Sequence, residues 1–298
     1  MTSGQQNLLL DLLGAMGGDV GATDFQKLLF LYTKEYETAP SYDFVPYRFG
    51  CFSFTATAYR RRLIERGMLS GDKEGWLLTE AGLAHTTARQ RSTGPMAGFV
   101  RRYGKMSGRP LVAEVYRRYP YYATRSTIVD STLPLAAERE AVARACPPKR
   151  GAGLLTIGYE GRSLEGYLNT LLLQGVTLLC DVRANPLSRK YGFSKKTLSH
   201  ACEGVGIRYA HVPELGIPSA DRQELNEQAD YDRLFGKYQR EVLPLQKEFL
   251  RRIGWWVKVD GLAVALTCYE RLPEQCHRRC VAVALEHEFG SLLAPHHL

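Results

Sequence analysis

The spacing of apolar residues predicts helices in the first half of the chain. Apolar positions recur every three or four residues within segments 8–13 and 25–32, which is the period of an amphipathic helix. Ser53 is a favourable N-cap for a third helix that ends at Gly67. The next segment, 68–79, has apolar ends around a polar turn, and it predicts a strand, a turn and a second strand.

Beyond residue 153 the pattern changes to short apolar strands that alternate with amphipathic helices. We expect strands at 154–157, 177–181, 207–211 and 262–268. We expect helices at 164–174, 195–203, 231–252 and 276–288. Such alternation favours a parallel sheet with crossover helices on its faces. The predicted fold class is therefore α/β, with a three-layer C-terminal domain built on a mostly parallel sheet.

Structure-breaking residues divide the chain of 298 residues into three parts. We expect a first domain at 1–92, a helical annex and linker at 93–152, and an α/β catalytic domain at 153–298. Within the first domain, the sequence LIERGML…GWLLTEAG (63–82) resembles the end of many bacterial winged helix-turn-helix domains. The sequence FVPYRFGCFSF (44–54) is similar to a bacterial winged-helix type found beside toxin or defence modules. These resemblances imply an N-terminal winged helix-turn-helix domain that binds nucleic acid.

Positive charge is concentrated in the first half of the chain. The formal net charge is +8; residues 1–150 carry 21 Lys+Arg against 14 Asp+Glu, and residues 151–298 carry 18 against 17. A concentrated positive field favours a polyanion, because each neutralised phosphate releases condensed counterions. We therefore expect the N-terminal domain to bind double-stranded DNA, with contacts from Arg60, Arg61, Arg62 and Lys73.

Composition and missing motifs disfavour several classes of protein. With 45% hydrophobic and 23% charged residues the sequence is typical of a globular chain, and no apolar run reaches the length of a membrane helix. The seven cysteines are an odd number and no secretion signal is evident, so we expect a reducing cytoplasm and no membrane partner. Because there is no P-loop, G-x-G-x-x-G or D-x-D cluster, we expect no cofactor.

Polar residues follow each predicted strand of the C-terminal domain. Since open parallel sheets bind ligands beyond the carboxyl ends of their strands, we expect these loops to converge. Asp181, Glu214 and Glu270 each follow a different strand, and they are the candidate catalytic residues because a carboxylate can activate water or stabilise an oxocarbenium ion. Phe193 suits core packing as well as stacking on a base. The candidate substrate-binding residues are Tyr159, Arg183, Ser188, Arg189, Phe193, Cys268, Cys276, His277 and Arg278.

Thiol and zinc chemistry are alternatives at the same edge of the sheet. Cys268 or Cys276 is a candidate nucleophile, and a position at a helix N-terminus lowers the pKa of a thiol such as that of Cys276. Adjacent helical residues point in different directions, so Cys276 and His277 do not form a ready pair of nucleophile and base. A zinc site of Cys268, Cys276, Cys280 and His277 lacks paired C-x-x-C spacing. We therefore predict no metal ligands, and a buried structural role for Cys280.

Four motifs of the C-terminal domain together resemble one known family. They are TIGYEGRS, CDVRANPLSRKYGFSK, YAHVPELG and ALTCYE…CHRRCVA, and they extend over residues 154–285. This segment resembles the family called domain of unknown function 488. The resemblance implies a small α/β domain with clustered polar loops, and it assigns no reaction. Gly-Ile-Pro follows Leu215 where many members have paired glycines, so this loop departs from the family pattern.

The combined features predict an enzyme that acts on DNA. We expect a hydrolase that removes a modified or damaged base, an N-glycosylase, in which Asp181 stabilises positive charge on the sugar and Arg183 binds a phosphate. Two alternatives stay open: a metal-dependent nuclease that uses the same carboxylates, and a non-catalytic DNA-binding regulator or defence-system sensor. Turnover separates the regulator from both enzymes, and metal dependence separates the two enzymes.

Overall fold

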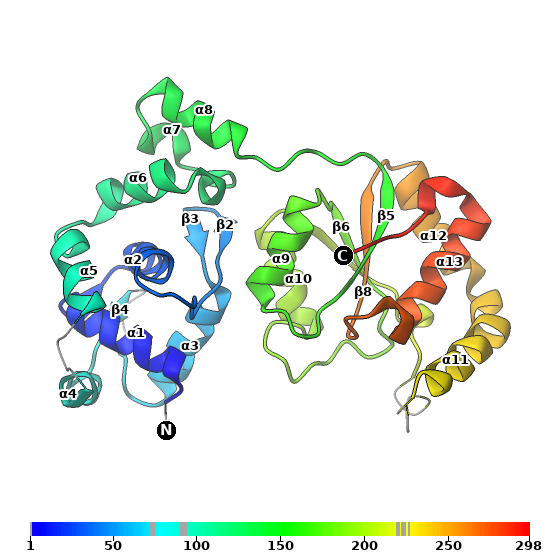
Figure 1. Cartoon of the computed structure of the whole chain (residues 1–298), viewed down its shortest axis with the longest axis horizontal. Helices are drawn as coiled ribbons and strands as arrows, with labels where there is room; N and C mark the ends of the chain where they lie inside the picture. The colour runs from blue at the N-terminus through cyan, green and yellow to red at the C-terminus, as the bar shows by residue number, and fades with distance from the viewer. Residues whose placement is uncertain (1, 72–74, 90–93, 219–220, 222–224, 226) are drawn as a thin grey trace. The chain divides into compact units, whose positions relative to one another are not determined.

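The chain divides into two units, Met1–Cys146 and Pro147–Leu298 (Figure 1). A computed structural model describes residues 2–71, 75–89, 94–218, 221, 225 and 227–298. Within these ranges, no helix combines the length and the hydropathy needed to cross a membrane.

The first unit is mostly helical, and its first three helices confirm the sequence prediction. Ser53 is the N-cap of the third, and its Oγ accepts a hydrogen bond of 3.2 Å from the Ala56 backbone N–H. Gly67 follows the end of this helix with φ of +69°, a conformation that glycine adopts without strain. The helices are α1 (Gly4–Ala15), α2 (Ala22–Glu35), α3 (Phe54–Glu65), α4 (Glu80–Arg89), α5 (Pro95–Tyr103), α6 (Gly108–Arg118), α7 (Val129–Thr132) and α8 (Ala136–Arg144).

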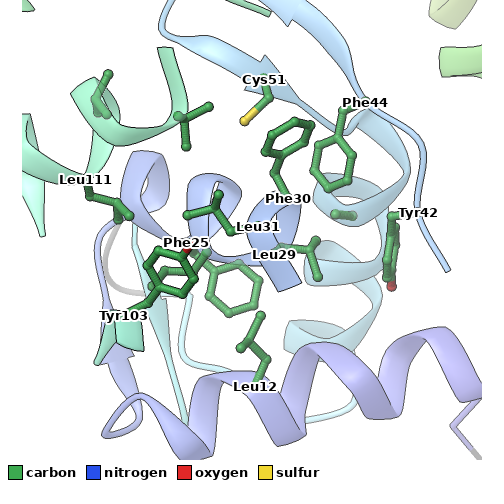
Figure 2. Packing of buried hydrophobic residues seen from close by; sticks show 14 of the residues in the cluster. Leu12, Phe25, Leu29, Phe30, Leu31, Tyr42, Phe44, Cys51, Tyr103 and Leu111 are labelled. Atoms are coloured by element: carbon green, nitrogen blue, oxygen red, sulfur yellow. The ribbon is translucent and has the colours of Figure 1, made fainter. Parts of the chain in front are cut away.

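A single aromatic-rich core holds the first unit together (Figure 2). Phe25 of α2 stacks on Trp76 with ring centroids 4.0 Å apart. Phe30, five residues further along α2, meets the rings of Phe44 and Tyr119 edge to face. The helices after residue 94 contribute Phe99, Tyr103, Leu111 and other buried side chains to the same core. Residues 94–146 therefore pack as part of the first unit.

The strands of the first unit are short, and they form two separate antiparallel pairs. β1 (Asp19–Val20) pairs with β4 (Trp76–Leu77), and β2 (Val45–Tyr47) pairs with β3 (Gly50–Phe52). Within the predicted strand, turn and strand over 68–79, a bridge joins Leu69 to Leu78 and β4 pairs with β1, while residues 72–74 of the predicted turn lie outside the described residues.

The second unit is built on a five-stranded parallel sheet, as the alternation of strands and helices predicted. The strand order is β7-β6-β8-β5-β9. The fifth strand, β9, was not predicted; it has only two residues, both exposed, and therefore no apolar pattern. The strands are β5 (Gly153–Gly158), β6 (Leu178–Asp181), β7 (Arg208–His211), β8 (Ala263–Cys268) and β9 (His296–His297).

Helices cover both faces of the sheet, with α9 and α10 on one side and α12 and α13 on the other (Figure 1). The predicted helical stretch over 231–252 is helical throughout, but a π-helical turn at Tyr238–Val242 and a 3₁₀ turn at Leu243–Gln246 separate two α-helices within it. Pro244 lies in this break, where it lacks an N–H for helical hydrogen bonding. The helices are α9 (Leu164–Leu173), α10 (Lys195–Gly204), α11 (Gln228–Lys237), α12 (Lys247–Lys258) and α13 (His277–Phe289).

Candidate active site

A pocket of about 380 Å³ lies among the loops that follow strands β5, β6 and β8. Because these strands are parallel, their carboxyl ends meet at one edge of the sheet, where open α/β sheets bind ligands. Six of the predicted site residues line the pocket: Tyr159, Arg183, Ser188, Arg189, Cys268 and Glu270. The rest of the lining is Ala184, Asn185, Leu187, Lys190, Ile217 and Tyr269.

Two glycines allow the loops to approach one another closely. A Cβ atom on Gly158, at the end of β5, would lie 1.9 Å from the Glu270 carbonyl oxygen. A Cβ atom on Gly216 would lie 2.0 Å from the backbone nitrogen of Ala184. Real Cβ atoms do not come this close to backbone atoms, so only glycine permits these contacts. The approach at Gly158 fixes the backbone that carries Glu270 over the end of β5.

Asp181 and Arg183 form a buried ion pair beneath the pocket. Arg183 Nε donates to Asp181 Oδ1 at 2.8 Å and Nη2 donates to Oδ2 at 2.6 Å, while Tyr209 donates its hydroxyl proton to Oδ2 at 2.6 Å. Burial alone would lower the pKa of Arg183, but the hydrogen bonds and charge of Asp181 outweigh it and raise that pKa. Burial and the same carboxylate raise the pKa of Tyr209. Asp181 is fully buried, so its predicted direct role on a sugar is replaced by support of Arg183.

Tyr159 connects the ion pair to the pocket wall. Arg183 Nη1 donates to the Tyr159 hydroxyl at 2.8 Å, and the Arg183 Cζ lies 5.0 Å from the centre of the Tyr159 ring. The Tyr159 ring also stacks on Phe193, with centroids 4.4 Å apart and planes at 8°. Phe193 is fully buried, so its predicted contact with a base is corrected to core packing under Tyr159.

The loop after β6 supplies cations and hydroxyl groups to the pocket. Ser194 holds this loop closed, because its Oγ accepts from the Ser188 N–H at 3.0 Å and donates to the Ser188 carbonyl at 3.1 Å. Lys190 Nζ donates to the Tyr159 carbonyl at 3.2 Å, and partial burial lowers the pKa of this ammonium group. Arg189 is exposed and lines the same pocket.

Glu270 lies beside a buried cluster of sulfur and nitrogen atoms. The Cys268 thiol donates to Glu270 Oε2 at 3.4 Å, and its Sγ lies 3.5 Å from Nδ1 of His277. His277 Nε2 donates to the Val182 carbonyl at 2.9 Å. Burial and the adjacent Cys268 raise the pKa of the Cys276 thiol well above its usual value, which overturns the expectation that the helix N-terminus lowers it.

Glu214 and Arg278 are two further predicted residues that lie outside the pocket lining. Glu214 lies in the short 3₁₀ helix Pro213–Leu215, where its side chain is exposed and outside the lining. Arg278 is fully buried, and it donates to the carbonyls of Glu270 and Arg271 and to the Thr156 hydroxyl. Its predicted contact with substrate is therefore corrected to bracing of the loop that carries Glu270.

A comparison with known families identifies much of the second unit. Residues 163–285 match the family described as Domain of unknown function DUF488. This match confirms the family resemblance expected for the C-terminal half. No curated protein and no solved structure matches the chain.

Within the segment that matches this family, the predicted site lacked several polar residues that the structure brings to the pocket or its support. Asn185 and Lys190 belong to the motif CDVRANPLSRKYGFSK, so their position in a loop after a strand was the available signal. Tyr209 and His211 are two residues apart in β7, so both side chains lie on the same face of the strand. His211 Nε2 donates to the Arg183 carbonyl at 2.8 Å and thereby helps to fix the loop after β6.

The predicted DNA-binding residues lie in the first unit, outside the DUF488 match. Arg60 is half-buried, and its Nε and Nη2 both donate to the Gly75 carbonyl, at 2.9 and 2.7 Å. Arg61 and Arg62 are exposed on α3. Lys73 lies outside the described residues.

Proposed function

We propose that this protein removes a modified or damaged base from DNA by hydrolysing its N-glycosidic bond in the pocket of the second unit. One observation carries the proposal: a carboxylate, three cationic side chains and two tyrosines line the same pocket. Hydrolysis at a sugar needs a carboxylate to transfer a proton or stabilise positive charge, and a nucleotide needs cations for its phosphates and aromatic rings for its base.

In this proposal Glu270 acts on the substrate, because it is the carboxylate among the residues that line the pocket. Water adds to the sugar carbon, the bond to the base breaks, and the base leaves with its electron pair and a proton. Glu270 takes the water proton or supplies the leaving-group proton. Arg189 and Lys190 suit the flanking phosphates, and Tyr269, which is 44% exposed, offers a ring for stacking on the base.

The first unit is proposed to deliver duplex DNA as a winged helix-turn-helix domain. Its net positive charge and the exposed Arg61 and Arg62 on α3 support a phosphate-binding surface. β4 and the bridge between Leu69 and Leu78 follow α3, where a wing would lie, and β4 pairs with β1 from before α2. Affinity for duplex DNA is expected to fall steeply as salt rises.

The geometry disfavours a nuclease that binds metal through the three predicted carboxylates. Asp181 is buried with both oxygens hydrogen-bonded, and Glu214 is exposed outside the pocket, so these two do not join Glu270 around an ion. A non-catalytic regulator would use the same pocket to bind a nucleotide without turnover. Activity measurements therefore separate the proposal from this alternative.

The test is incubation of the full chain with duplex oligonucleotides that carry a panel of modified bases, followed by alkali and gel electrophoresis. Strand breaks that form only after alkali, together with release of the free base, are expected. Breaks without alkali would instead indicate a nuclease. Binding of the oligonucleotides without base release or cleavage across the panel would support the regulator.

A further inference from the structure

Three potential metal ligands meet behind the pocket wall. Cys268 ends β8, Cys276 precedes α13, and His277 begins that helix. The two Sγ atoms and one imidazole nitrogen lie within 4.8 Å of one another, and all three side chains are buried. Thiolates and imidazole are the ligands that Zn²⁺ prefers in proteins.

The orientation of His277 is the one that metal-binding histidines use. Its Nε2 lies 2.9 Å from the Val182 carbonyl, which can only accept a hydrogen bond, so the ring proton sits on Nε2. The Nδ1 lone pair then points toward the Cys268 sulfur. A ring N–H that donates to a backbone carbonyl is the usual outer-shell contact of a metal-ligating histidine.

The distance between two of the donor atoms also fits tetrahedral coordination of a metal ion. Zinc bonds of about 2.3 Å to sulfur and about 2.0 Å to nitrogen place the two donor atoms roughly 3.5 Å apart at the tetrahedral angle. Cys268 Sγ and His277 Nδ1 are 3.5 Å apart. The sulfur and nitrogen atoms of a thiol that is hydrogen-bonded to imidazole have a similar separation. A nucleophile and base of that kind, however, would use only one cysteine. The second buried thiol, Cys276, favours a metal.

We propose that Cys268, Cys276 and His277 bind one thiophilic divalent cation, best matched by Zn²⁺, with its fourth coordination position toward the pocket. Binding converts both thiols to thiolates and releases their protons to solvent. Cys268 and Glu270 both line the pocket, so a water in the fourth position would lie near the Glu270 carboxylate. Metal binding does not depend on the proposed base excision, since the same ligands would hold a structural ion.

The donor set differs from the one considered from sequence. Cys280, one helical turn beyond Cys276, lies outside the cluster, while the remaining three ligands are brought together by the end of a strand and the start of a helix. Three protein ligands with one open position are typical of catalytic zinc sites, whereas structural sites usually have four. Cys280 therefore provides a matched control, because it is a buried cysteine on the same helix.

The test is metal analysis of the full-length chain purified under reducing conditions without added metal, followed by replacement with Co²⁺. We expect about one equivalent of Zn²⁺ per chain, and the thiolate charge-transfer and tetrahedral ligand-field bands of Co²⁺ after exchange. A folded, reduced chain that contains no stoichiometric metal and gives no such bands with Co²⁺ would overturn the proposal. This measurement on the unaltered chain decides the question even if a cysteine variant fails to fold.

Substitutions of single residues identify which side chains bind the metal ion. Cys276→Ser is expected to weaken Co²⁺ binding by more than about a hundredfold, since loss of outer-shell partners alone typically costs 10–100-fold. Cys280→Ser should bind Co²⁺ as the unaltered chain does, and Glu270→Gln should keep the tetrahedral spectrum. Bands that disappear in Cys280→Ser or in Glu270→Gln, but persist in Cys276→Ser, would contradict the ligand set.

Discussion

Arg183 holds both carboxylate oxygens of Asp181, which lies only two residues before it, through hydrogen bonds of 2.8 and 2.6 Å. The Asp181 side chain is fully buried and that of Arg183 is 6% exposed. A third hydrogen bond of Arg183 reaches the Tyr159 hydroxyl at the pocket wall. The pair therefore positions an aromatic wall of the pocket from below, and removal of one partner leaves an uncompensated buried charge.

Asp181→Asn is expected to destabilise the second unit by about 3 kcal/mol, because it leaves the buried Arg183 guanidinium without its counter-ion. Chemical denaturation of the full chain measures this change. Asp130→Asn is a matched control, because Asp130 is 97% exposed and its ion pair with Arg139 spans 3.9 Å. That substitution should change stability by less than about 0.5 kcal/mol. Equal stability of the two variants would show that the buried pair contributes little.

Arg189→Ala is expected to weaken binding of the DNA substrate and to reduce the slope of log affinity against log salt by about 1, since one phosphate contact is lost. Titration of the full chain at several salt concentrations measures the slope. Arg208→Ala is the control, because Arg208 is exposed at the amino-terminal end of β7, whereas the pocket lies at the carboxyl ends of the strands. A slope that changes as much in Arg208→Ala as in Arg189→Ala would argue against a phosphate contact in the pocket.

Arg61 and Arg62 are expected to contribute to duplex binding, whereas Arg60 contributes to stability. Replacement of Arg61 and Arg62 by alanine should reduce the salt slope by about 2 and leave the melting temperature near that of the unaltered chain. Arg60→Ala should lower the melting temperature, because the Gly75 carbonyl loses both of its guanidinium donors. Unchanged duplex affinity in the double variant would remove this face of α3 from the proposed DNA interface.

Cysteine reactivity separates carboxylate from thiol chemistry. Six of the seven cysteines are buried and Cys146 is exposed, so rapid alkylation at about pH 8 should be confined to Cys146. Burial restricts the access of reagent to the Cys276 thiol, and it raises the pKa of Cys280 to about 11. Cys146→Ser should therefore lose the rapid phase while base release continues. Rapid alkylation of Cys268 with loss of turnover would favour a thiol nucleophile.

Much of the second unit could be predicted because its apolar strands are buried along their whole length. β5 and β8 are buried at every position, so their continuous apolar runs mark them as interior strands. Their parallel direction then brought Tyr159, Cys268 and Glu270 to one pocket. β9 carried no such pattern, since it is a two-residue exposed strand.

The direction of individual side chains could not be predicted from strand ends alone. Glu214 follows its strand as expected, but the 3₁₀ turn buries the adjacent Leu215 and leaves Glu214 exposed. Tyr238 donates to the Leu215 carbonyl at 2.6 Å and thereby anchors this turn from a distant helix. Cys268 and His277 are nine residues apart, so their contact depends on the path of the intervening loop.

The central claim is that Glu270 is the carboxylate that acts on the substrate. Its most direct test is single-turnover base release by Glu270→Gln, with Glu274→Gln as control because Glu274 is exposed on the same loop and outside the pocket lining. Removal of a well-placed general acid or base lowers a rate by about two to four orders of magnitude, so Glu270→Gln should lower the rate of base release at least about a hundredfold. The affinity of Glu270→Gln for duplex DNA should stay near that of the unaltered chain. Glu274→Gln should release the base at nearly the rate of the unaltered chain. A folded Glu270→Gln protein that releases the base at nearly the original rate would contradict the claim.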